Sequence, residues 1–80
     1  MRKNPEKPRQ GSQRLGRIIW GNILRQQYLL GITDTQLCEV LGVTPRTLLN
    51  YRKAPTAITL RQLQALLVSF GVDAETLLRQ

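Results

Sequence analysis

The sequence predicts an all-α protein, a compact bundle of four or five short helices without strands. Two observations lead to this class. Apolar residues recur three and four positions apart, which places them on one face of a helix. The expected helices also begin at residues that cap free N–H groups. Three of them are followed by glycine, which can adopt the left-handed backbone conformation that ends a helix.

The first expected helix runs from a Ser12 cap to about Leu30. By spacing, its apolar face comprises Ile19, Trp20, Ile23, Leu24 and Tyr28. Gly16 and Gly21 each weaken this helix by roughly 1 kcal/mol relative to Ala, or else allow a close helix contact.

Residues 33–53 predict a helix-turn-helix, two short helices joined by a tight turn. Thr33 and Gln36 have the spacing of a capping box, and Gly42 fits the turn. Thr44 followed by Pro45 fits the start of the second helix. Leu37, Cys38, Leu48 and Tyr51 are expected to face inward. The alternative is an ordinary helix–glycine–helix corner of an all-α protein.

Two further helices are expected after a turn at Pro55. Thr59 with Gln62 repeats the capping-box spacing, and Asp73 can cap a last short helix. The expected apolar residues of these two helices are Leu60, Leu63, Leu66, Leu67, Phe70, Leu77 and Leu78.

Composition bounds the function. Eighty residues make one domain, and one Cys without any His provides neither a disulfide framework nor a Cys/His metal cluster. Cys38 is expected to be buried, and no paired carboxylates or phosphate-cradling glycine loop occur, so we predict no enzyme, cofactor or metal.

No apolar run approaches the roughly 18 residues of a membrane span, and no signal-peptide core is present. A cytoplasmic protein is expected.

The charge is concentrated at the N-terminus. The chain carries a net charge of +7, of which residues 1–17 contribute +5. Residues 1–11 contain two prolines and several charges, so we expect a flexible basic arm there and a folded domain over residues 12–80. A basic segment of this kind attracts nucleic acid or anionic membranes. The arm residues expected to contact DNA are Arg2, Lys3, Lys7 and Arg9; the alternative is a solubilising tail.

The expected segments follow one another in a fixed order: a capped helix, the GVTPRTLLNY turn and helix, a loop with a proline, TLRQLQALLVSFGV and DAETLL. In this order the chain resembles the lambda-repressor-like helix-turn-helix domain over about residues 15–79. These are the Xre/Cro-type regulators of bacteria and phages. The resemblance implies a small transcriptional regulator, commonly a repressor, which binds double-stranded DNA as a homodimer on an inverted-repeat operator. It also implies that the second motif helix, residues 44–52, reads the major groove.

The resemblance places the DNA contacts on particular residues. The implied base-reading residues are Thr44, Arg46, Leu49 and Asn50. The implied phosphate contacts are Thr33, Thr35, Thr47, Lys53 and Thr56. Arg46 can reach guanine or a phosphate, Asn50 matches adenine, and Leu49 can meet only a thymine methyl. Leu77 and Leu78 are candidates for the dimer contact.

The chain departs from the family pattern at Gln27, Arg52 and Asp34, and also at Pro45, where many relatives carry a base-reading polar side chain. The buried Arg–Glu pair of many relatives corresponds here to Gln27 and Arg52, so the ion pair is expected to be absent and a hydrogen bond to replace it. Asp34 brings a negative charge to the expected phosphate contact, so it must turn away or cap its helix. The exposed Leu49 also leaves a second function open, a protein-binding helical module of the antitoxin or adaptor type.

Overall fold

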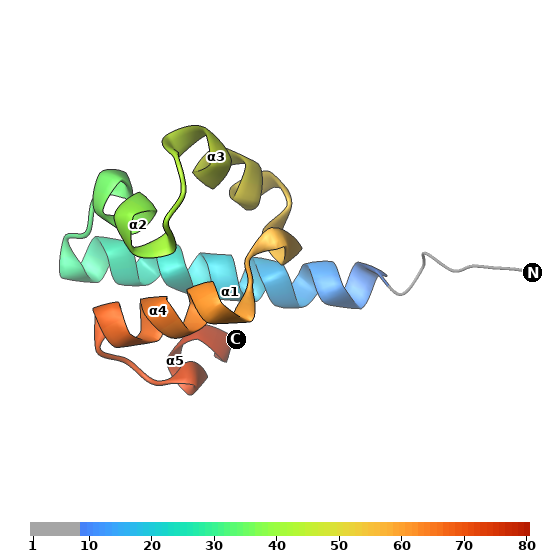
Figure 1. Ribbon diagram of the computed structural model, residues 1–80. Coiled ribbons are helices and arrows are strands. Elements are labelled where there is room, and N and C mark those ends of the chain that lie inside the picture. Colours follow the sequence, from blue (N-terminus) through green and yellow to red (C-terminus); the bar gives the residue numbers. More distant parts are fainter. Residues whose placement is uncertain (1–8) are drawn as a thin grey trace, which may run out of the picture.

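The computed structural model describes residues 9–80 (Figure 1) and confirms the all-α class. Within this range the helices are α1 (Arg9–Leu30), α2 (Asp34–Leu41), α3 (Pro45–Lys53), α4 (Leu60–Phe70) and α5 (Ala74–Leu78). A 3₁₀ turn, η1 (Pro55–Ala57), leads from α3 to α4. No strand occurs in the described part of the chain.

The long helix α1 runs through the middle of the molecule. In the view of Figure 1, α2 and α3 are drawn above α1, with α4 and α5 below them, and α4 packs directly against α2. The helix begins at Arg9, three residues before the expected Ser12 cap. Pro8 is the last proline before it, and Arg and Gln both favour helix, so nothing in residues 9–11 except one glycine opposes an earlier start. Among the described residues, α1 is too polar to serve as a membrane span and the other helices are too short.

The core draws on all five α-helices. Its buried residues are Ile19, Trp20, Ile23, Leu37, Cys38, Leu41, Leu48, Leu66, Phe70 and Leu77. Four residues expected in the apolar faces are instead exposed: Leu24 (47%), Tyr28 (88%), Leu60 (75%) and Leu78 (48%). In α1 the reason is angular, because Gln27 continues the inward row of Ile19 and Ile23 and is itself buried. Tyr28, one residue further, is turned away from the core by about 100°.

The expected Ser12 cap is wrong, since Ser12 lies inside α1, but the expected caps of the four later α-helices are confirmed. The Thr33 hydroxyl accepts the Gln36 N–H at 3.1 Å, and the Gln36 side chain accepts the Thr33 N–H at 2.8 Å, which completes a capping box. Thr59 and Gln62 form a second box. Thr44 and Asp73 cap α3 and α5 through the N–H three residues on. Gly42, at φ 72°, makes the turn between α2 and α3, where a side chain would be strained.

A close contact at Gly16 positions η1 against α1. A Cβ on Gly16 would lie 2.9 Å from Pro55 Cβ and 3.1 Å from the Pro55 carbonyl carbon. A Cβ on Gly21 would have nothing within 4 Å. Of Gly16 and Gly21, only Gly16 therefore allows the close contact that the sequence left open. This contact places η1, which carries Thr56, against α1.

Candidate DNA-binding site

Helix α3 has one face in the core and one in solvent. Leu48 is 2% exposed, and Tyr51 packs edge-on against Trp20 with ring centroids 6.5 Å apart. On the other face, Arg46, Leu49 and Asn50 are exposed. The expected division between inward and outward residues is therefore confirmed.

The inner face of α3 is also tied to α4 by hydrogen bonds. Gln62 Nε2 donates to the Tyr51 hydroxyl oxygen at 3.2 Å and to the Leu41 carbonyl oxygen at 3.1 Å. The side-chain oxygen of the same Gln62 completes the Thr59 capping box. The Gln62 side chain thus caps α4 and contacts the ends of both motif helices. These contacts fix the orientation in which α3 exposes its outer face.

The residues expected to contact phosphate form two groups. Thr33 and Thr35 are exposed at the start of α2. Lys53 is exposed at the end of α3, and Thr56 is exposed in η1. Thr47 differs, because it is half-buried and its hydroxyl oxygen accepts a hydrogen bond from the Thr44 hydroxyl at 3.1 Å. This bond involves Thr47 in the α3 cap and leaves it less accessible than the other four.

The arm residues are only partly within the described range. Arg2, Lys3 and Lys7 lie outside it. Arg9 is the first residue of α1, although its side chain is not among those described. The candidate site that the structure brings together therefore consists of α3, η1 and the start of α2.

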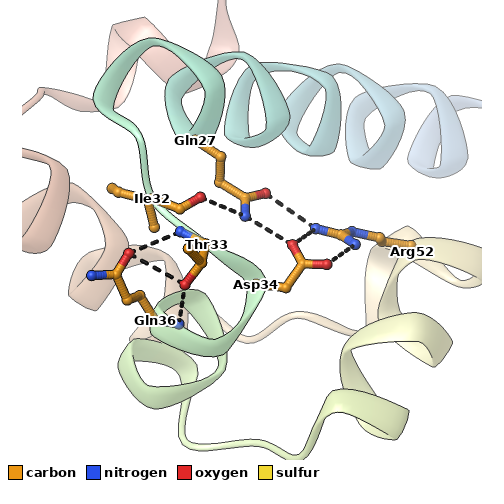
Figure 2. Close-up of polar contacts among 6 residues, drawn as sticks. All are labelled: Gln27, Ile32, Thr33, Asp34, Gln36 and Arg52. Carbon is orange, nitrogen blue, oxygen red and sulfur yellow. Dashed lines mark hydrogen bonds and ion pairs between the residues drawn. The ribbon is translucent and has the colours of Figure 1, made fainter.

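Behind this surface, three side chains from three different helices form a closed hydrogen-bonded group, shown in Figure 2. Arg52 Nη2 donates to Gln27 Oε1 at 3.1 Å, which confirms the expected Gln27–Arg52 hydrogen bond. The same guanidinium donates to both carboxylate oxygens of Asp34, from Nη2 at 3.0 Å and from Nη1 at 3.2 Å. Gln27 Nε2 donates to Asp34 Oδ1 at 3.0 Å and closes the ring. We call these three residues the clamp.

The clamp gives Arg52 an ion-pair partner at a position other than 27. The carboxylate is absent from position 27, but Asp34 supplies it from the first turn of α2. The position of Asp34 also answers how its charge is accommodated, since its carboxylate is directed at Arg52 (Figure 2). No short-range pattern indicates this pair, because the two residues are 18 positions apart.

The clamp changes the electrostatics of the start of α2. The hydrogen bond from Arg52, and then that from Gln27, lowers the pKa of Asp34 below its usual 3.8. The Arg52 guanidinium carbon lies 6.0 Å from the centre of the Trp20 ring, within the range of a cation–π interaction. Asp34 is therefore ionised at neutral pH, and its charge is balanced within the protein.

Nothing in the described residues indicates metal chemistry. No group of three or more His, Cys, Asp or Glu side chains within residues 9–80 is arranged to hold a metal ion. Cys38 is buried, as expected.

An apolar cleft lies between α1, α4 and α5. It has a volume of about 260 Å³, and its walls include Leu15, Leu60, Leu77 and Leu78. Leu77 is only 2% exposed and belongs to the core, so it is not available as a dimer contact. Leu78 is 48% exposed at the edge of the cleft.

A glycine turn between two capped helices, with the second helix fixed by its inner face and polar on its outer face, defines a helix-turn-helix domain. Residues 23–77, more than half of the chain, match the family model described as "Helix-turn-helix". The protein belongs to this family of DNA-binding regulatory domains, in its lambda-repressor-like form. No curated protein and no solved structure gives a match.

Proposed function

We propose that this protein is a sequence-specific double-stranded DNA-binding protein, a small transcriptional regulator of the repressor type that docks residues 44–52 in the major groove. The observation that supports this is the two-sided character of α3. Leu48 and Tyr51 hold its inner face, while Arg46, Leu49 and Asn50 project from its outer face. Direct base readout needs a rigid helix whose polar side chains are long enough to contact base edges in the groove.

Each outer residue has a distinct proposed contact. Arg46 offers two parallel donors to the O6 and N7 atoms of guanine, or grips a phosphate. Asn50 offers the donor and acceptor that match adenine N7 and N6. Leu49 contacts a thymine methyl group, and Thr44 uses its hydroxyl at the helix cap. Pro45, which lies between Thr44 and Arg46, has no hydrogen-bond donor to offer a base.

Phosphate contacts fix the protein on the duplex in this proposal. Thr33 and Thr35 contact the backbone on one side of the groove, and Lys53 and Thr56 do so on the other. Thr47 contributes less, because its hydroxyl is engaged with Thr44. The basic arm adds salt-dependent affinity by displacing counterions.

A single nine-residue reading helix covers few base pairs, so we propose a homodimer on an inverted repeat. Its half-sites would lie about one helical turn apart, roughly 34–36 Å. Leu78 remains the candidate for the dimer contact, since Leu77 is buried. Sedimentation of the protein with and without operator DNA measures the stoichiometry, and two protomers on each duplex are expected.

The test is selection of bound duplexes from a randomised pool at physiological salt, followed by sequencing. An enriched inverted repeat is expected. The variant Arg46→Ala/Asn50→Ala should lose the enrichment, whereas the control Arg61→Ala/Gln64→Ala should keep it. The control removes the same kinds of side chain from the exposed face of α4. Retention of DNA without enrichment would reduce the function to nonspecific phosphate binding.

The exposure of Leu49, at 57%, favours a second candidate function, a protein-binding helical module of the antitoxin or adaptor type. Leu49→Lys separates the two functions. A variant that still binds DNA but no longer binds a protein partner supports the module. Loss of the selected operator sequence supports base contact by Leu49.

A further inference from the structure

Asp34 is an unusual residue for a surface that approaches phosphates. It opens α2 between Thr33 and Thr35, and its side chain is 61% exposed. An unpaired carboxylate there would repel the DNA backbone. The positive end of the α2 dipole would stabilise this carboxylate and would attract a phosphate less. Its only ion pair with a described residue is with Arg52.

Arg52 is committed to the clamp rather than to solvent. Its two terminal nitrogens donate three hydrogen bonds, two to Asp34 and one to Gln27, and its side chain is 24% exposed. Arginine keeps its charge at any working pH. Arg52 lies next to Lys53 on the last turn of α3. Asp34, an acidic residue of the same motif, thus holds Arg52 away from phosphate.

We propose that Asp34 is a specificity-determining residue that withholds Arg52 from nonspecific phosphate contact and fixes the end of α3, so that tight binding depends on base readout. The proposal rests on the DNA-binding function proposed above. Specificity is a difference between two affinities, and a feature that weakens binding to the wrong duplexes raises it as effectively as a new contact to the right one. Here the weakening is electrostatic.

A purely structural clamp predicts a different pattern of effects. If the three residues only hold the helices together, removing either charge lowers stability and weakens operator binding, and binding to random DNA does not improve. If Asp34 restrains Arg52, the two charges have opposite effects on random DNA. Removal of Asp34 strengthens binding to it, and removal of Arg52 weakens it because Asp34 is left unpaired.

The experiment measures the affinity of the full chain for its selected duplex and for a random duplex by fluorescence anisotropy, across a range of salt concentrations. The variants are Asp34→Asn, Arg52→Gln and the two combined. Glu39→Gln is the matched control, because it removes the same charge from an exposed position of the same helix that has no ion pair with a described residue. Circular dichroism establishes that each variant is folded at the working temperature.

For Asp34→Asn we expect random-duplex binding about threefold to tenfold tighter than that of Glu39→Gln, with a salt slope steeper by about 0.9, the value of one added phosphate contact. The selected duplex gains less, so discrimination falls. Arg52→Gln weakens random binding, and the combined variant returns toward wild type. Asp34→Glu keeps the charge and is expected to restore discrimination, which guards against misreading a folding defect in Asp34→Asn.

Equal random-duplex affinities for Asp34→Asn and Glu39→Gln would overturn the proposal while leaving the DNA-binding function intact. Weaker random binding in Asp34→Asn would also overturn it, in favour of a structural clamp. Wild-type protein that does not prefer its selected duplex over the random one would instead overturn the proposed function, and this inference with it.

Discussion

The carboxylate of Asp34 and the guanidinium of Arg52 form a two-point ion pair, at 3.0 and 3.2 Å, that joins the first turn of α2 to the last turn of α3. Gly42 joins the other ends of these helices, so the motif is closed at both ends. An exposed ion pair contributes only about 0–1 kcal/mol to stability. We therefore regard its main effect as orientation, since it limits how far α3 can swing about the turn.

Acidification should destabilise the fold through Asp34 and Asp73. Hydrogen bonds from Arg52 and Gln27 lower the pKa of Asp34, and those from Thr76 lower that of Asp73, relative to the usual 3.8. A carboxylate whose pKa is lower in the folded state stabilises the fold above its unfolded pKa. This contribution is lost as the pH falls through the folded value.

Melting curves between neutral pH and about pH 2 measure this effect, and the melting temperature should begin to fall near pH 4. An Asp34→Asn/Asp73→Asn variant should show a shallower fall. Asparagine keeps a capping oxygen at position 73, so the variant removes the titrating groups with little loss of capping. The same acid dependence in the variant and the wild type would show that other carboxylates dominate.

Asn50→Ala should weaken operator binding by about 1–3 kcal/mol and relax the preference at one base position. The reason is that the amide is the one side chain on the outer face of α3 that matches adenine with a donor and an acceptor. Titration against duplexes that vary at each position of the selected site measures it. Gln64→Ala, an amide removed from α4, is the control and should bind as wild type. An equal loss on every duplex would contradict base reading by Asn50.

Deletion of residues 2–8 should reduce the salt dependence of DNA affinity without changing the preferred sequence. The deletion removes Arg2, Lys3 and Lys7 and spares α1, which begins at Arg9. Each lost phosphate contact should reduce the slope of log affinity against log salt by about 0.9. Affinity measured at several salt concentrations gives the slope. An unchanged slope would leave the arm with no part in phosphate binding.

Gly16 and Gly21 of α1 offer a matched pair of stability tests. Gly16→Ala should destabilise the protein, because its Cβ would meet Pro55 Cβ at 2.9 Å, and we expect the overpacking cost of about 1–3 kcal/mol to exceed the gain in helix propensity. Gly21→Ala meets nothing within 4 Å and should stabilise it by up to about 1 kcal/mol. Urea unfolding measures both. A stabilised Gly16→Ala would show that η1 can move away from α1 at little cost.

The local structure could be predicted from the sequence wherever a contact joins residues three or four apart. The Thr33 and Thr59 capping boxes, the Gly42 turn and the inward placement of Leu48 are of this kind. The same short-range pattern placed Arg46 and Asn50 on the outer face of α3, while their DNA contacts remain predictions. It was wrong at Tyr28, because one step of 100° separates the core row of α1 from solvent.

By itself, then, the sequence determined which segments become helices, where the helices after α1 begin, and which residues of the reading helix lie on its outer face. Only the tertiary structure decided that Asp34 pairs with Arg52 across 18 residues, that Gly16 seats Pro55, and that Gln27 is buried while Tyr28 is not. The physical reason is range. Caps and turns are satisfied within one helical turn of the chain, whereas the partner of a charge or the neighbour of a glycine depends on how whole helices pack.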